Sequence, residues 1–149
     1  MREIDSKLIT ETVKRLFLEA NTCLGADVLA ALQTSLAREE SPLGRQVLAR
    51  MLENAAVARE EAAPICQDTG LAVVFVELGQ DVHVAGDLLN AAIEEGVRQA
   101  YEEGYFRKSV CDPLTRANTG DNTPAVINVE IVAGDRIRLG VMPKGGGQR

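Results

Sequence analysis

The sequence predicts an α+β fold in which N-terminal helices pack on a mostly antiparallel or mixed β-sheet, with one further helix and a C-terminal hairpin. Apolar residues recur near the helical period through the first sixty residues, whereas β-branched runs begin only at Leu71. Helices and strands therefore come in blocks rather than in a regular βαβ series. A chain of 149 residues, 46% hydrophobic and 3% aromatic, is expected to form one domain over residues 1–149 with an aliphatic core.

Three helices are predicted before residue 64. Gly25 is the expected stop of the first, and Ser41 and Pro42 are a favourable N-cap and first residue for the third, which Pro64 closes. The apolar stripes that define them are Leu8, Ile9, Val13, Leu16, Phe17 and Ala20; then Val28, Leu29, Leu32 and Leu36; then Val47, Leu48, Met51, Leu52 and Ala55.

Two strands, a helix and a hairpin are predicted after residue 70. The strands are "LAVVFVELG" (71–79) and "DVHVAG" (81–86), and the helix is expected to be capped by Asp87 and to end at Gly104. The segments "AVINVEIV" (125–132) and "RIRLGVM" (136–142) alternate in hydrophobicity on either side of "AGD". This pattern is typical of a hairpin.

Composition and charge exclude several classes of function. A net charge of −6 and a pI near 4.9 leave no basic stripe for nucleic acid, and no apolar run is long enough to cross a membrane. The N-terminus lacks the apolar region of a signal peptide, so we expect a cytoplasmic protein with reduced thiols. The three cysteines form no CxxC pair, which argues against a compact zinc site.

Three polar clusters interrupt the aliphatic pattern. They are "CQDTG" (66–70), "FRKSVCDPLTRANTGDNTP" (106–124) and "KGGGQR" (144–149). Each also fits a structural role: a turn with a buried cysteine, a loop and a flexible tail. In the last cluster, consecutive glycine N–H groups and Lys144 could instead bind an anion.

Two kinds of chemistry could use Cys66. A nucleophilic thiolate needs a base, and His83 is the one histidine of the chain, although it lies in an alternating strand pattern. Alternatively, Cys66 anchors one corner of a metal centre while Gln67, Asp68 and Thr69 contact a substrate beside it. The residues alone leave both interpretations open.

The motifs "PICQDTG", "GYFRKSV" and "DPLTRANTGDNTPAVINVEIVAGDRIRLGVMPKGGG", in this order, resemble the N-terminal part of the alpha subunit of the class I fumarase and L-tartrate dehydratase family of iron–sulfur hydro-lyases. The resemblance implies a 4Fe-4S cluster held by three cysteines, of which Cys66 is one. Cys23 and Cys111 match no ligand position, so the other two ligands are expected beyond residue 149, and the alpha subunit is expected to be truncated after Gly147. The isolated chain is then expected to hold no cluster and to be inactive.

The same resemblance implies the roles of the site residues. Asp68 is the catalytic candidate, and Gln67, Asp68, Arg107 and Gly147 are expected to bind substrate. The resemblance also implies a small dicarboxylate substrate, fumarate or malate, with tartrate as an alternative. A beta subunit or C-terminal catalytic region is the expected partner in an oligomeric enzyme. A non-catalytic scaffold or partner-binding module is the alternative from a different class. Residues expected in the pocket wall are Thr69, Asn118, Thr119, Asp121 and Lys144.

Overall fold

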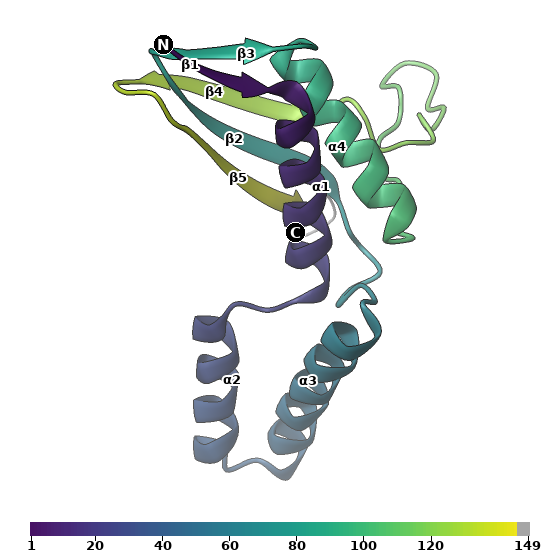
Figure 1. Cartoon of the computed structure of the whole chain (residues 1–149). Coiled ribbons are helices and arrows are strands. Elements are labelled where there is room, and N and C mark those ends of the chain that lie inside the picture. The colour runs from purple at the N-terminus through teal and green to yellow at the C-terminus, as the bar shows by residue number, and fades with distance from the viewer. Residues whose placement is uncertain (146–149) are drawn as a thin grey trace. The chain divides into compact units, whose positions relative to one another are not determined.

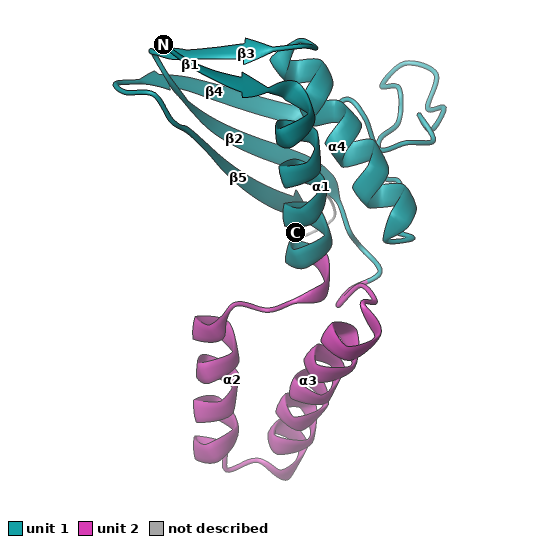
Figure 2. Ribbon diagram, in the orientation of Figure 1, with its two compact units in different colours: residues 1–20, 67–149 teal, residues 21–66 magenta. Residues whose placement is uncertain are grey.

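The computed structural model of the chain describes residues 1–145 and divides into two compact units (Figures 1 and 2). The first unit contains residues 1–20 and 67–149, and the second contains residues 21–66. The elements in chain order are β1 (Arg2–Asp5), α1 (Ser6–Thr22), α2 (Ala26–Arg38), α3 (Pro42–Glu61), β2 (Leu71–Gly79), β3 (Val82–Ala85), α4 (Leu89–Glu103), β4 (Val126–Val132) and β5 (Ile137–Lys144).

Two small sheets organise the first unit (Figure 1). In the larger sheet the strand order is β4-β2-β5, and β2 pairs parallel with β4 and antiparallel with β5. In the smaller sheet β1 pairs parallel with β3. The α+β fold with a mixed sheet is therefore confirmed, and β1 is a strand that the sequence pattern did not indicate.

The predicted pairing of β4 with β5 as a hairpin is wrong, because β2 lies between them. Neighbouring strands are about 4.8 Å apart, so the connection 133–136 has to cross roughly 10 Å over the end of β2. Backbone bonds to Gly79, Gln80 and Asp81 hold this crossing, including Gly79 N–H to the Arg136 carbonyl at 2.8 Å. A methyl group on Gly79 would lie 2.5 Å from the Gly134 carbonyl oxygen, so glycine permits the close passage.

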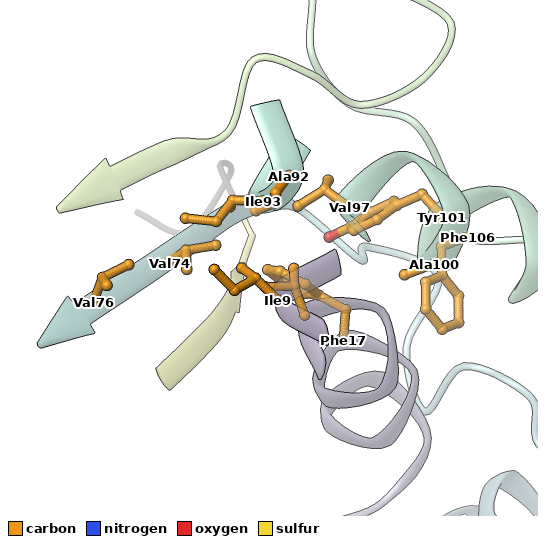
Figure 3. Close-up of a cluster of buried hydrophobic side chains, with 12 residues drawn as sticks. Ile9, Phe17, Val74, Val76, Ala92, Ile93, Val97, Ala100, Tyr101 and Phe106 are labelled. Carbon is orange, nitrogen blue, oxygen red and sulfur yellow. The ribbon is translucent and has the colours of Figure 1, made fainter. Parts of the chain in front are cut away.

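The core of the first unit lies between β2 and the two helices α1 and α4. Phe17 of α1 and Tyr101 of α4 are fully buried, with ring centroids 5.9 Å apart in an edge arrangement, and Tyr101 packs in the same way against Phe106 at 5.5 Å (Figure 3). The buried residues of this cluster are Ile9, Val13, Phe17, Ala72, Val74, Val76, Ala92, Ile93, Val97, Ala100, Tyr101 and Phe106.

Two of the predicted helix boundaries are confirmed and two are wrong. The Ser41 hydroxyl accepts the Gly44 N–H at 3.4 Å at the start of α3, and Gly104 is the C-cap of α4. Gly25, expected to stop the first helix, is instead the N-cap of α2. Asp87 does not cap α4, whose N-cap is Leu88; the Asp87 N–H instead donates to the Ser6 hydroxyl at 3.0 Å.

The second unit is a pair of helices, α2 and α3, with their flanking segments (Figure 2). The buried residues of α3 are Ala55 and Ala58, and none of the described residues of α2 is buried. Among residues 1–145, no helix has the length and apolar character needed to span a membrane.

Candidate functional site

The first polar cluster contacts the beginning of the third, Lys144 and Gly145, at the start of β2. Leu71 is in register with Lys144, so the last residues of β5 lie against the Asp68–Gly70 turn. Gly70 has φ of 64°, and a methyl group on it would lie 2.2 Å from the Lys144 carbonyl. A methyl group on Gly145 would similarly lie 2.8 Å from a carboxylate oxygen of Asp68. The glycines thus let two motifs that are more than 70 residues apart approach closely.

The segment that carries Arg107 is bonded to the same turn. The Thr69 hydroxyl donates to the Arg107 carbonyl at 2.9 Å, and Thr69 is only 2% exposed. The hydroxyl of Tyr101 donates to the Thr69 carbonyl at 2.7 Å. Because Tyr101 belongs to the core, these bonds connect the turn and the Arg107 segment to the rigid part of the unit.

Asn122 is the buried polar centre of this region. Its side-chain oxygen accepts the N–H groups of Ser109, at 2.6 Å, and Val110, at 3.2 Å. Its amide nitrogen donates to the Gly70 carbonyl at 3.1 Å, and the residue is fully buried. Its φ of 62° is a conformation that asparagine tolerates better than most residues. One side chain therefore joins the segment after Arg107 to the turn after Asp68.

Asn118 and Thr119 bond to the loop in which they lie. The Asn118 side chain donates to the Lys108 carbonyl at 2.9 Å, and the Thr119 N–H donates to the Val110 carbonyl at 3.0 Å. Both residues are exposed. Their bonds give the loop a defined conformation.

Asp121 forms a polar contact between this loop and α4. Arg98 donates to it at 3.1 Å, and the N–H and hydroxyl of Thr123 donate at 3.0 and 2.8 Å. Burial opposes ionisation, but these hydrogen bonds outweigh it and lower the pKa of Asp121 to about 2. The carboxylate is therefore ionised across the physiological range.

The remaining candidates are exposed. Gln67, Asp68, Arg107 and Lys144 lie in the first unit with their side chains accessible to solvent. Gly147 lies outside the described residues. His83, the alternative base, is an exposed residue of β3 in register with Glu3 of β1.

Cys66 is the last residue of the second unit, and it is exposed. Cys111 is also exposed, and Cys23 is half-buried. Within residues 1–145, no group of three His, Cys, Asp or Glu side chains is arranged to hold a metal ion. The described residues thus do not complete a metal centre, although an exposed cysteine such as Cys66 is of the type that contributes one ligand to an iron–sulfur cluster.

Sequence reasoning did not single out Asn122. Asn118, Asp121 and Asn122 belong to one run of turn-forming residues, and composition alone does not tell which side chain is buried. The sequence pattern likewise did not indicate the hydrogen bond from the Tyr101 hydroxyl to the Thr69 carbonyl.

A family model described as "Fumarate hydratase (Fumerase)" matches residues 10–149. The chain is 37% identical over 146 residues to a Methanocaldococcus jannaschii protein named "Putative L(+)-tartrate dehydratase subunit alpha", covering 93% of this chain and 51% of that protein. It is 37% identical over 112 residues to "Fumarate hydratase class I, aerobic" of Escherichia coli strain K12, covering 73% of this chain and 20% of that protein. It is 32% identical over 112 residues to "Fumarate hydratase 2" of Leishmania major, also covering 73% of this chain and 20% of that protein. The chain thus spans about half or less of the length of these relatives.

Proposed function

The chain belongs to the class I fumarate hydratase family, and from this premise we propose that it forms part of an iron–sulfur hydro-lyase that adds water to, or removes it from, a small dicarboxylate. Fumarate and malate are the proposed substrate pair. The observation that carries the proposal is the joining of the Asp68–Gly70 turn, the Arg107 segment and the end of β5 around Gly70. Each of these segments belongs to one of the three polar clusters, so their contact brings part of every cluster to the same place.

Cys66 is proposed to supply one thiolate of a 4Fe-4S cluster. When bound, such a cluster supplies a Lewis-acidic iron for the hydroxyl group of the substrate. Since residues 1–145 do not complete a metal centre, the other two ligands are proposed to come from a polypeptide region or subunit that this chain does not include. The isolated chain is accordingly proposed to be inactive.

Asp68 and Arg107 are proposed to act on the substrate itself. A guanidinium group binds a carboxylate through two parallel hydrogen bonds, so Arg107 is suited to fix one end of a dicarboxylate. The exposed carboxylate of Asp68 is suited to orient the substrate hydroxyl or to exchange a proton with it. Both residues are accessible, as a site that is completed by another part of the enzyme requires.

The other candidates are proposed to complete the pocket. Gln67 beside Asp68 and the backbone of Gly147 would contact substrate, and the cationic Lys144 would favour a dianionic ligand at the end of β5. Thr69, Asn118, Thr119 and Asp121 are proposed to shape the pocket through the bonds that fold the turn and the loop.

Tartrate dehydration is the second candidate. The match to the protein named as a tartrate dehydratase subunit covers 93% of this chain, whereas the match to the Escherichia coli enzyme covers 73%. Both reactions remove water from a hydroxy-dicarboxylate, so the proposed roles of Cys66, Asp68 and Arg107 are the same in either case.

The proposal is tested by anaerobic reconstitution of this chain with the region or subunit that completes the relatives, followed by assays with fumarate, malate and tartrate. We expect activity on one of these acids from the mixture and none from either part alone. Arg107→Lys keeps the charge but loses the two-pronged geometry, and it should raise KM at least tenfold, which is about 1.4 kcal/mol of binding free energy. The control Arg45→Lys, at an exposed position of α3, should leave KM within twofold.

An assembled complex that binds no iron and is inactive on all three acids would favour the scaffold alternative. Activity without bound iron that requires both Cys66 and His83 would favour nucleophilic thiol chemistry. Either result would overturn the proposal.

A further inference from the structure

We propose that Asn122 and Thr69 are positioning residues that fix Arg107 relative to Asp68, so that the two side chains address the same dicarboxylate. The inference rests on the proposed function and deepens it by naming what sets the spacing of the site. Neither side chain is placed to touch substrate itself, because Thr69 is 2% exposed and Asn122 is fully buried.

Arg107 lies in an irregular segment, between Phe106 on one side and Ser109 and Val110 on the other. Residues 105–110 belong to no helix or strand, so no regular ladder of backbone bonds holds Arg107 in place. Phe106 is anchored by its 2% exposed ring and by its N–H, which donates to the Tyr101 carbonyl at 3.0 Å. The position of Arg107 then depends on what holds the segment after it.

Asn122 holds that following part through its buried side chain, while Asn118 and Thr119 bond to the carbonyls of Lys108 and Val110. The Asn122 side-chain oxygen accepts from both Ser109 and Val110, and its amide nitrogen donates to the carbonyl of Gly70, two residues after Asp68. Three of the four hydrogen bonds that an asparagine side chain can form are therefore used to join these two segments. In a buried setting, such bonds restrict backbone motion because water cannot replace them readily.

Thr69 makes the second connection, at Arg107 itself. Its hydroxyl donates to the Arg107 carbonyl at 2.9 Å, while its own carbonyl accepts from Tyr101 at 2.7 Å. Thr69 follows Asp68 directly in the chain. Thr69 therefore bonds directly to the backbone of Arg107, and Asn122 connects Ser109 and Val110 to Gly70. Together the two side chains hold the Arg107 segment against the backbone next to Asp68.

This arrangement predicts a specific kinetic effect. Removal of the Thr69 hydrogen bond or of the Asn122 hydrogen bonds should let the Arg107 backbone move. The buried ring of Phe106 should still keep the first unit folded. Because Arg107 is proposed to bind a substrate carboxylate in the ground state and in the transition state alike, its displacement should raise KM more than it lowers kcat.

The test compares four variants in the anaerobically reassembled enzyme. Asn122→Ala removes all three bonds, and Thr69→Val removes the hydroxyl at nearly constant volume; each should raise KM at least tenfold and lower kcat less than fivefold. Thr69→Ser restores the hydroxyl and should return KM to within threefold of the parent. Val13→Ala, a fully buried position of α1, is the control that lowers stability away from these bonds and should leave KM within twofold.

A second measurement uses this chain alone and needs no activity. Backbone hydrogen exchange at Ser109 and Val110 should accelerate at least tenfold in Asn122→Ala relative to exchange at the core residue Val97. Unchanged exchange at both amides would overturn the anchoring role of Asn122 even if the variant were inactive. The exchange measurement also tests the role of Asn122 if the Asn122→Ala variant does not reassemble into the complete enzyme.

The outcomes separate this inference from the proposed function. If the parent enzyme is active but Thr69→Val and Asn122→Ala keep its KM, or if Thr69→Ser is as impaired as Thr69→Val, the positioning role is overturned and the proposed function stands. If the parent is inactive on every dicarboxylate after reassembly, the proposed function fails and the inference fails with it.

Discussion

Replacement of Gly70 by alanine perturbs the contact on which the candidate site is built. Gly70 combines φ of 64° with a backbone neighbour so close that an added methyl group would lie 2.2 Å from the Lys144 carbonyl and 2.6 Å from the Gly145 nitrogen. A side chain could rotate away from such a clash, but backbone atoms of β5 cannot. Gly70→Ala therefore requires the end of β5 to separate from the start of β2.

The expected cost has two parts. The left-handed conformation costs alanine about 1–2 kcal/mol, and accommodating an extra methyl group in a closely packed region costs about 1–3 kcal/mol. Together they predict a loss of about 2–5 kcal/mol in the free energy of unfolding of the first unit. Gly120→Ala is the matched control, because Gly120 has φ of 82° but no atom within 4 Å of the added methyl group. It should lose only the conformational part, about 1–2 kcal/mol.

Tyrosine fluorescence during urea denaturation measures the first unit specifically. The chain has no tryptophan and two tyrosines, Tyr101 and Tyr105, and both lie in that unit. Backbone hydrogen exchange at Met142, near the end of β5, should accelerate in Gly70→Ala and not in Gly120→Ala. Equal stability losses in the two variants, with unchanged exchange at Met142, would refute the close contact between Gly70 and Lys144.

Three further predictions concern the cluster ligand, pH dependence and the core. In the reassembled enzyme, Cys66→Ser should abolish iron content and activity while Cys111→Ser retains both; iron measured anaerobically and unchanged in Cys66→Ser would contradict the ligand role. Because hydrogen bonds lower the pKa of Asp121 to about 2 from 3.8, its contribution to stability should be complete above about pH 5 and be lost as pH falls through 4 toward 2. Solvent screening limits this contribution to about 1 kcal/mol, and Asp121→Asn should flatten the acid limb of a plot of stability against pH. An unchanged limb would argue against the hydrogen bonds that Thr123 and Arg98 donate to Asp121. Phe17→Ala should lower the free energy of unfolding by about 3–5 kcal/mol, measured by the same tyrosine fluorescence, and a loss below 1 kcal/mol would contradict its full burial.

The amino-acid sequence by itself determined the features that depend on near neighbours in the chain. The apolar stripes located the helices, since the helical period brings residues three and four apart to one face. The cap at Ser41 and the end of α4 at Gly104 were predicted because a cap is formed by residues within one turn. The three polar clusters were set apart from the aliphatic pattern by their residue types, and their assignment to one site followed from the family resemblance.

Only the tertiary structure decided which distant segments meet. Alternation in 125–132 and 136–142 showed that both are strands, but a short connection does not require its two strands to pair, and β2 supplied hydrogen bonds to each of them. The same limit applied to "NTGDNTP", where Asn118 and Asn122 have the same chemistry. Asn122 became buried because the Gly70 carbonyl and the N–H groups of Ser109 and Val110 converge on it, and those partners lie 12 to 52 residues away. Pairing and burial of this kind are set by groups that a local pattern does not contain, so they become visible only once the chain is folded.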